Sequence, residues 1–472
     1  MGIEQVALEY IDDQDEKLAY LARQIWDRPE IALEEQFASK LLADELEAAG
    51  FAVERNVGQL PTAFVASWGS GGPIIGILGE YDALPGLSQQ MASERSAIKS
   101  GGPGHGCGHN LFGVASLAAA IALKAAMERE QIAGTVRFYG CPAEETLVGK
   151  TFMAKAGLFD DLDAALAWHP GDTNVVWAGS SLAMYSFKVN FHGVTSHAAA
   201  DPHNGRSALD GAQLMDIGVN YLREHVIPEA RIHSVITSGG QAPNVVPAYA
   251  QIWYFVRAPR REQVAAIYER MLDIAKGAAL MSGTTYDIDF VTGCAELLPN
   301  ATLSRLMFEK MQAVGGMSFS AEEQSFAKQL QETFAPGMLK QAFALTQRLV
   351  REELDPAMIE TPLWEQILPH VESFIVLPGS TEVGDVSQIT PTGQLTTCCW
   401  PLGTPGHSWQ IVASSGSSIG AKGMLLAAKA LALSGLDLLT RPELLAEVKA
   451  EFTRKMQGER YVSPIPEGTV PH

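Results

Sequence analysis

Three apolar segments of this sequence each end in a short run of polar or charged residues. They are PIIGILGEYD, GTVRFYGCPAEE and DAALAWHPGD, which occupy residues 73–82, 134–145 and 163–172. Continuous apolar runs are typical of strands that are covered on both faces, as in a parallel sheet between helices. A long apolar helical segment at 110–130 separates the first two. The sequence therefore predicts an α/β fold with a mostly parallel sheet, whose polar residues gather at the carboxyl ends of the strands, where such sheets bind ligands.

A different pattern begins at about Tyr185. The segment YSFKVNFHG alternates apolar and polar residues, as a half-exposed strand does, and helix, strand, strand, helix and strand patterns follow it up to about residue 297. This β-α-β-β-α-β order is that of ferredoxin-like α+β domains. We therefore predict one α/β domain formed by residues 1–184 and 298–472, with a ferredoxin-like domain inserted at 185–297.

Within the α/β domain, further elements are expected on both sides of the insertion. Helical patterns cover residues 13–50, 301–355 and 418–440, and SFIVLPG at 373–379 is typical of a strand. No role can be assigned to residues 301–370 from the sequence.

The charge balance excludes several classes of partner. The chain has 34 Lys and Arg against 54 Asp and Glu, a net charge of −20. Such a surface repels phosphate backbones and anionic lipid, so neither nucleic acid nor a membrane surface is an expected partner. The N-terminal residues lack the features of a secretory signal, and no uncharged apolar run reaches about 18 residues, so we expect a cytoplasmic protein without a membrane span.

Four loops carry side chains that bind metal ions. GHGCGHN supplies Cys107 and His109, PAEE ends in Glu144 and Glu145, AWHP supplies His169, and GTPGHSW supplies His407. Taken alone, each loop has an ordinary structural explanation. Taken together, thiolate, imidazole and carboxylate donors at one sheet edge favour zinc or manganese, and five donors are too many for one tetrahedral ion but suit two.

Adjacent glutamates after a buried strand suggest a division of labour. One carboxylate would bind metal, and the other would act as general base to a water that the metal activates. The loop GEYDALPG adds Glu80 and Asp82. Asp82 could accept a hydrogen bond from a ligand imidazole and fix its tautomer. Glu80 is left open as a ligand, a residue behind the ligands or a structural carboxylate.

These loops resemble those of the dinuclear metallopeptidases of family twenty, and the cysteine of the C-G-H loop resembles the amidohydrolase branch of that family. The resemblance covers nearly the whole chain and includes AWHPGD, STEVGDVSQ and GTPGHSWQ. It implies a catalytic domain of zinc-peptidase type, an inserted dimerisation or lid domain, and Glu144 as general base and acid. The ligands that it implies for two divalent ions, Mn²⁺ or Zn²⁺, are Cys107, His109, Glu145, His169 and His407.

The sequence departs from the family pattern at three places. Glu80 stands where other branches have a ligand histidine, and the arginine-alanine-aspartate of the first loop is absent. STEVGDVSQ replaces a serine-glutamate-aspartate-phenylalanine pattern, so Asp385 either shapes the substrate pocket or is a turn residue.

The inserted domain carries a second group of family-like segments. GVTSHAAADPHNGRS, SGGQAPNVVP and FVRAP resemble the dimerisation-domain loops of the family. The resemblance implies that His197 stabilises the oxyanion of the tetrahedral intermediate, often from across a dimer, and that Asn244 and Arg257 bind a substrate carboxylate. For His203 and Arg206 we favour a structural or helix-capping role.

The resemblance implies a metal-dependent enzyme that cleaves the amide bond of an N-acyl amino acid, most closely p-aminobenzoyl-glutamate. A dipeptidase, another N-acyl amino acid hydrolase and a non-catalytic partner subunit are the alternatives. A hydrolase with Cys107 as nucleophile is a further possibility, but it leaves the clustered His and Glu residues unexplained. The expected partners are a small-molecule substrate and a second chain, in a homodimer or in a heterodimer with a related subunit.

Overall fold

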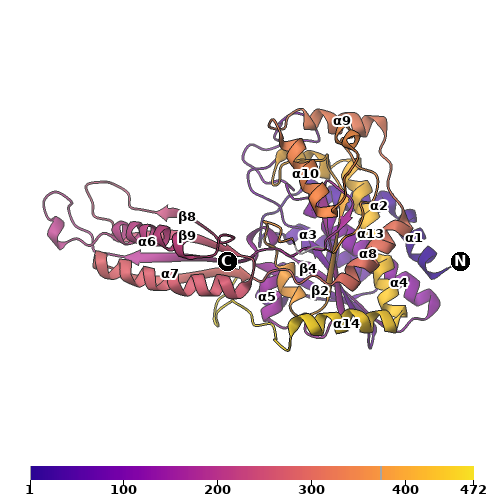
Figure 1. The fold of residues 1–472 in the computed structure, drawn as a ribbon, viewed down its shortest axis with the longest axis horizontal. Helices are drawn as coiled ribbons and strands as arrows, with labels where there is room; N and C mark the ends of the chain where they lie inside the picture. Colours follow the sequence, from indigo (N-terminus) through magenta and orange to yellow (C-terminus); the bar gives the residue numbers. More distant parts are fainter. Residues whose placement is uncertain (1, 373–374, 472) are drawn as a thin grey trace. The chain divides into compact units, whose positions relative to one another are not determined.

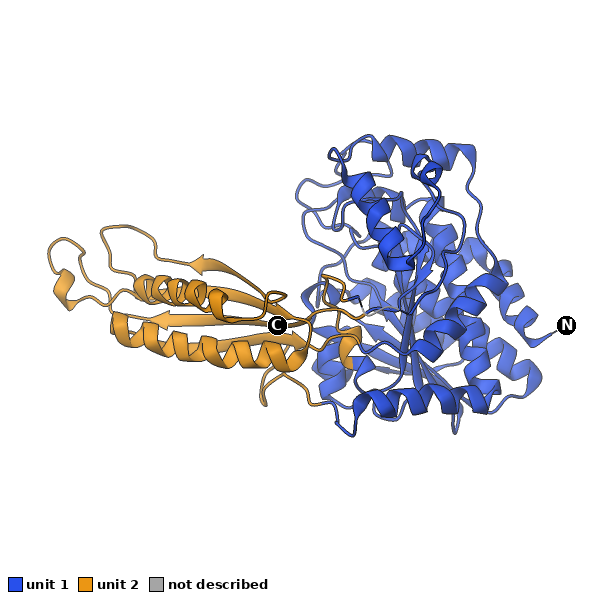
Figure 2. Cartoon of the chain, in the orientation of Figure 1, with its two compact units in different colours: residues 1–179, 298–375, 386–461 blue, residues 180–297, 376–385, 462–472 orange. Residues whose placement is uncertain are grey.

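The computed structural model describes residues 2–372 and 375–471 (Figure 1). The chain divides into two compact units (Figure 2). Unit 1 comprises residues 1–179, 298–375 and 386–461, and unit 2 comprises residues 180–297, 376–385 and 462–472. The segment 185–297 expected from the sequence lies inside unit 2, which also takes two short segments from the C-terminal part of the chain.

Unit 1 is built on a seven-stranded sheet with the order β1-β2-β4-β3-β5-β11-β6. The four central strands, β4, β3, β5 and β11, pair in parallel, and the outer strands β1, β2 and β6 are antiparallel. The predicted parallel α/β core is thereby confirmed, with antiparallel strands added at both edges. The bounds of the strands are β1 Ala52–Arg55, β2 Phe64–Ser70, β3 Ile74–Glu80, β4 Gly134–Cys141, β5 Ala164–Gly171, β6 Val175–Val176 and β11 Thr392–Cys398.

Two long helices form the centre of the hydrophobic core of unit 1. Both α4 (His109–Glu130) and α13 (Ser418–Thr440) are apolar around nearly their whole circumference, and they pack against each other. Each is long and apolar enough to cross a membrane by length and composition, but 89% and 83% of their most apolar windows are buried in the structure. Burial on all sides is typical of the core helices of a large domain.

The remaining helices of unit 1 differ in part from the sequence prediction. The stretch 13–50 contains a break between α2 and α3, and the stretch 301–355 forms three helices rather than one. The bounds are α1 Ile3–Asp13, α2 Asp15–Asp27, α3 Gln36–Ala48, α5 Gly149–Lys155, α8 Ala301–Val314, α9 Ala321–Gln331, α10 Met338–Val350, α12 Trp409–Ser415 and α14 Pro442–Met456. The short helix α11, Val383–Ser387, contains the point where the chain passes from unit 2 to unit 1.

The last strand of the sheet is β11, and the strand predicted at 373–379 is wrong. Residues 373–374 lie outside the described residues, and Val376 forms only an isolated bridge with Ser180. The segment that enters the sheet, TGQLTTC, looks too polar for a central strand, yet it is fully buried. Its hydroxyls have partners, because Thr397 donates to the carbonyl of Gly423 at 2.8 Å and Thr396 accepts from the indole of Trp177 at 2.7 Å.

Unit 2 contains a four-stranded antiparallel sheet with the order β10-β7-β9-β8. The chain runs β7 (Ala183–His192), α6 (Ala208–Leu222), β8 (Arg231–Ser238), β9 (Tyr249–Ala258), α7 (Arg261–Ser282) and β10 (Thr285–Cys294). This connection order on this strand order is the ferredoxin-like arrangement, which confirms the prediction. The edge strand β8 exposes most of its side chains.

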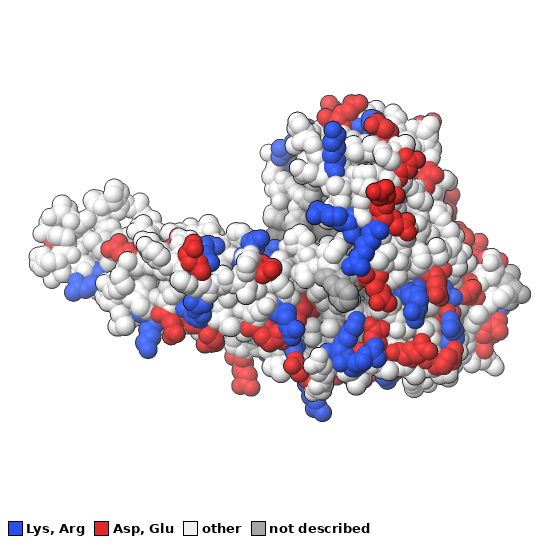
Figure 3. Space-filling view, viewed as in Figure 1, with Lys and Arg blue, Asp and Glu red and all other residues white. Residues whose placement is uncertain are grey.

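The net negative charge is spread rather than gathered on the visible surface. On the face drawn in Figure 3, acidic and basic side chains are interspersed. The acidic excess therefore acts as a general property of the surface, and local charge at a site has to come from particular side chains.

A candidate metal centre at the carboxyl ends of the central strands

The loops at one edge of the unit 1 sheet bring the predicted metal ligands together. Glu80 is the last residue of β3, and a 3₁₀ turn, Glu144–Thr146, follows β4. His169 lies near the end of β5. Cys107 precedes α4, whose first residue is His109, and His407 lies in the loop before α12. Parallel strands present their carboxyl ends on the same side of a sheet, so residues far apart in sequence meet there.

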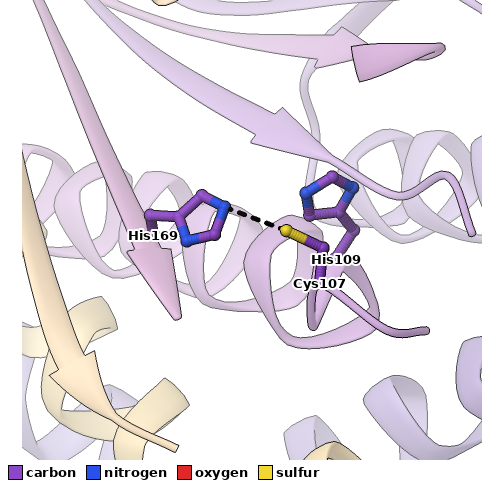
Figure 4. Close-up of side chains that lie close together, drawn as sticks. All are labelled: Cys107, His109 and His169. Atoms are coloured by element: carbon purple, nitrogen blue, oxygen red, sulfur yellow. Dashed lines mark hydrogen bonds between the residues drawn. The ribbon is translucent and has the colours of Figure 1, made fainter. Parts of the chain in front are cut away.

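One group of donors comprises Cys107, His109 and His169, whose ligand atoms lie within 4.8 Å of one another (Figure 4). The Sγ atom of Cys107 lies 3.4 Å from Nε2 of His169. Nδ1 of His109 lies 2.9 Å from Oδ1 of Asp82, and Nδ1 of His169 lies 2.7 Å from its neighbouring carbonyl. Because Nδ1 of each ring is engaged by an oxygen, Nε2 is the nitrogen presented to a metal.

A second group comprises Cys107, Glu145 and His407, again within 4.8 Å. Nε2 of His407 lies 3.3 Å from Oε2 of Glu145, and the His407 side chain is 59% exposed. Cys107 belongs to both groups. A single thiolate is therefore placed to bind two ions at once, one on either side of the sulfur.

A third group joins Glu80, His109 and Glu144. Oε2 of Glu80 lies 3.3 Å from Nε2 of His109, and Oε2 of Glu144 lies 3.9 Å from the same nitrogen. The other oxygen of Glu80 pairs with Nζ of the fully buried Lys150 at 2.8 Å. Glu80 therefore holds a fixed orientation beside the donor cluster.

The donor cluster fits a divalent cation. Oε2 of Glu80 and Nε2 of His109 are buried and have no hydrogen-bond partner among the described residues. Such atoms are costly to bury in a protein unless something satisfies them. Thiolate, imidazole and carboxylate are the donors that Zn²⁺ accepts, and mixed imidazole and carboxylate sets also suit Mn²⁺.

The electrostatics of the cluster show a surplus of negative charge. Burial, together with Asp82 and Glu80, raises the pKa of Glu145 to about 7. Burial and the charge of Glu145 raise the pKa of the Cys107 thiol above its ordinary value, while burial and His109 lower the pKa of His169 to about 4. A bound cation reverses this situation, because it stabilises the deprotonated thiol and carboxylate and binds the neutral imidazole.

The backbone around these residues is tightly fixed. Gly108, between Cys107 and His109, has a φ of +77°, and a Cβ there would come within 2.9 Å of Trp400 and 3.1 Å of Pro170. Only glycine lets the chain turn there and bring both donors to the same side. Asp82 contributes twice, because its Oδ1 contacts the His109 ring and its Oδ2 accepts the backbone N–H of Glu145 at 2.9 Å.

The predicted residues of unit 2 are arranged differently. His197 and Asn244 are exposed and lie on adjacent loops, since His197 forms a bridge with Val245 and the N–H of Ala198 donates to the carbonyl of Asn244 at 3.0 Å. Arg257 lies near the other end of β9, eight residues after Tyr249, which corresponds to about 26 Å along the strand. Within one chain, unit 2 therefore brings His197 and Asn244 together but not Arg257.

The other polar residues singled out in unit 2 have structural contacts. Nη1 of Arg206 donates to the carbonyls of His203 at 3.1 Å and Gly205 at 2.6 Å. Asp385 is buried, and its Oδ2 accepts the backbone N–H of Ala295 at 3.2 Å. These contacts hold loops of unit 2 in place.

Sequence reasoning missed two residues that support the cluster. Lys150 follows the glutamate pair by five residues, and no motif marks it. Glu35 is fully buried and accepts the N–H of Ala143 at 2.9 Å. The only sequence signal for Glu35 is that the acidic segment PEIALEEQ interrupts a helical pattern.

Comparison with known proteins agrees with this fold and this site. The family described as peptidase dimerisation domain, M20_dimer, matches residues 183–280, which lie in unit 2. A putative aminohydrolase from methicillin-resistant Staphylococcus aureus has a similar structure, with 20% identity and a TM-score of 0.63 over 92% of this chain and 100% of that one. A dinuclear metal binding peptidase of the M20 family from Bacillus subtilis shares the fold at 17% identity and a TM-score of 0.51, over 89% of this chain and 98% of that one.

The chain belongs to the M20 family of metal-dependent peptidases and amidohydrolases, as the motifs implied. Among individual proteins, it is 44% identical to one of the two p-aminobenzoyl-glutamate hydrolase subunits of Escherichia coli K12, over 99% of both chains. It is also 32% identical to the Xaa-Arg dipeptidase of Mus musculus, over 97% of this chain and 94% of the relative.

Proposed function

We propose that this protein hydrolyses p-aminobenzoyl-glutamate to p-aminobenzoate and glutamate at a centre that holds two divalent ions. The observation that carries the proposal is the position of Cys107, whose sulfur belongs to two separate donor groups with Glu144 beside them. The substrate follows from the full-length relative at 44% identity, which is named for this activity.

Two groups of residues would hold the ions. Cys107, His109 and His169 would bind one, and Cys107, Glu145 and His407 would bind the other, with Zn²⁺ and Mn²⁺ as the candidate metals. When bound, such ions lower the pKa of a water molecule towards about 7 and polarise an amide carbonyl.

Glu144 is the residue placed to move the proton. Its carboxylate lies 3.9 Å from His109 at the edge of the donor cluster, and the residue is only 9% exposed. Glu144 would take a proton from the attacking water and then donate it to the departing nitrogen. His197 would donate a hydrogen bond to the developing oxyanion, and Asn244 and Arg257 would bind the free carboxylate of the substrate.

The separation of His197 and Asn244 from Arg257 along β9 favours a site completed by a second chain. We propose that the open edge strand β8 and the adjacent helix α6 form the contact, because Val235, Ile236, Ile217 and Tyr221 are all exposed there. A second copy and a related subunit both fit. The chain is 29% identical to the other p-aminobenzoyl-glutamate hydrolase subunit of Escherichia coli K12, over 47% of this chain and 53% of the relative.

The first test is release of p-aminobenzoate by the purified protein loaded with Mn²⁺ or Zn²⁺, compared with Glu144→Gln. We expect the variant to keep two ions per chain and to lose activity by about 10²- to 10⁴-fold, the contribution of a general base. Glu34→Gln is the matched control, because Glu34 is exposed and lies outside the cluster. Substantial turnover by Glu144→Gln would contradict its role.

The same assay separates the alternatives. Cleavage of an Xaa-Arg dipeptide without release of p-aminobenzoate would favour a dipeptidase, the activity for which the Mus musculus relative is named. Binding of two ions without any turnover would point to a missing partner subunit or to a non-catalytic role.

Mixing two variants tests how the chains share the site. His197→Ala and Arg257→Ala should each be inactive, and a mixture in which the chains have exchanged at equal amounts should recover about one quarter of wild-type activity if each site takes one residue from each copy. No recovery would leave a related subunit as the partner, or place both residues in one site.

A further inference from the structure

A buried carboxylate that the proposed mechanism does not use lies next to the loop of Glu144. Glu35 is 0% exposed. Its Oε1 accepts the backbone N–H groups of Leu33 and Ala143, each at 2.9 Å, and its Oε2 accepts the hydroxyl of Thr62 at 2.7 Å. No Lys or Arg pairs with it among the described residues, so three hydrogen bonds from three separate segments satisfy this group.

The loop that receives this contact has an unusual backbone. Glu144, Glu145 and Thr146 form a 3₁₀ turn between Ala143, with a φ of 55°, and Leu147, with a φ of 58°. Neither flanking residue is glycine, and each left-handed residue costs about 1–2 kcal/mol. Such a conformation persists only where the surrounding structure fixes it.

The two backbone N–H groups on either side of Glu144 each donate to a buried carboxylate. The N–H of Ala143 donates to Glu35, and the N–H of Glu145 donates to Asp82 at 2.9 Å. From this geometry we propose that Glu35 is a positioning residue for the general base, fixing one side of its turn while Asp82 fixes the other. The proposal rests on the proposed function of Glu144.

The support behind Glu35 is itself anchored. Thr62, which donates to Glu35, presents its backbone carbonyl to the hydroxyls of Tyr81 at 2.6 Å and Ser39 at 2.7 Å. Tyr81 directly follows β3, and Ser39 lies in α3. Glu35 therefore connects the turn of Glu144 to two elements of the core, and its position is set by them.

The consequence for catalysis is geometric. A general base has to lie within hydrogen-bond reach of the proton that it takes, and a displacement of about 1 Å can cost about 100-fold in rate. Withdrawing the Glu35 carboxylate frees Ala143 and lets the turn relax towards ordinary backbone angles. Glu144 then moves, whereas the ligands on α4 and β5 remain.

The test compares two conservative variants of the same residue. Glu35→Gln keeps an oxygen at the same reach, and Glu35→Asp withdraws it by one methylene. We expect Glu35→Asp to lower kcat about 10- to 100-fold with KM within about twofold and two ions per chain, and Glu35→Gln to stay within about fivefold of wild type. Glu34→Asp, at the exposed neighbouring position, is the control.

A second readout does not depend on activity. The amide hydrogens of a peptide covering residues 140–148 should exchange faster in Glu35→Asp, because the N–H of Ala143 loses its acceptor, and should be unchanged in Glu34→Asp. If Glu35→Asp fails to fold, Thr62→Val, which removes the hydrogen bond to Oε2, should give the same direction with a smaller effect.

The outcomes separate this inference from the proposed function. Normal kcat and normal exchange in Glu35→Asp, with Glu144→Gln inactive, would overturn the positioning role and leave the general base in place. Full activity of Glu144→Gln would remove the general base, and faster exchange in Glu35→Asp would then show only that Glu35 holds the loop, so the positioning role in catalysis would be overturned with it.

Discussion

The donor cluster of unit 1 and the predicted functional residues of unit 2 are held in opposite ways. In unit 1, His109 contacts Asp82 through one nitrogen and faces the cluster with the other, and the backbone of Glu145 is fixed by the same aspartate. In unit 2, His197 and Asn244 are exposed on loops. The comparison indicates that the metal end is assembled within one chain, whereas the substrate end waits for a further contact.

The largest effect expected is on the shared ligand of the assembled region. Cys107→Ser replaces a thiolate that two donor groups have in common, so both metal sites should weaken. We expect at least one ion per chain to be lost on dialysis and activity to fall by at least about 100-fold. Metal analysis by mass spectrometry, beside Cys141→Ser as a buried cysteine outside the cluster, measures this; full metal content would contradict the shared role.

The second prediction compares a buried ion pair of unit 1 with an exposed one of unit 2. Lys150→Met leaves the carboxylate of Glu80 buried without this cation, which should cost about 3–5 kcal/mol in the free energy of unfolding. Asp287→Asn, which breaks the exposed contact of Asp287 with His192, should cost less than about 1 kcal/mol. Denaturant unfolding measures both, and equal costs would remove the distinction between the units.

The third prediction concerns the pH dependence of stability. Burial and the charge of Asp82 raise the pKa of Glu35 from 4.5 to about 7. Between these values the native state holds a proton that the unfolded chain has released, so the stability from this group falls as pH rises from about 4.5 to 7. The full change is on the order of 3 kcal/mol.

Glu35→Gln should remove this part of the pH dependence. Unfolding by urea at pH 5 and pH 7 should therefore show a smaller difference in the variant than in the wild type. The same difference in both would show that Glu35 titrates normally in the native state.

The smallest effect is expected on unit 2, where no internal contact is broken. Val235→Lys places a charge on the open edge of β8, where Val235 is 55% exposed. The association of chains should weaken at least about tenfold while the melting temperature of dilute protein changes little. Sedimentation over a range of concentrations measures this, with Tyr20→Lys on unit 1 as the control; unchanged association would exclude β8 as the contact.

The sequence predicts those features that depend on local pattern. Alternation in the segment of β7 and β9 and apolar runs in β3, β4 and β5 identify both sheets, because burial on one or two faces leaves a direct trace in residue order. The order of the strands and the clustering of the donor loops at one edge follow from the same parallel topology. The roles of the individual site residues remain predictions.

The features that the sequence does not predict depend on contacts between distant segments. Strand β11 is rich in threonine, and only the partners of Thr396 and Thr397 explain why it can be buried. Glu35 and Lys150 have no recognisable spacing to the ligands, because they reach the cluster through space. Buried polar side chains of this kind become visible only when their hydrogen bonds can be counted.

The distribution of unit 2 over three chain segments has a consequence for synthesis. Its four strands and two helices are contiguous from residue 183 to 294, so they are complete while β11 and α13 of unit 1 have yet to leave the ribosome. Domains generally fold as units in the order in which they are made. Unit 2 should therefore fold first, and its last segment, in which Pro464 lies against Gly293 of β10, should join a sheet that already exists.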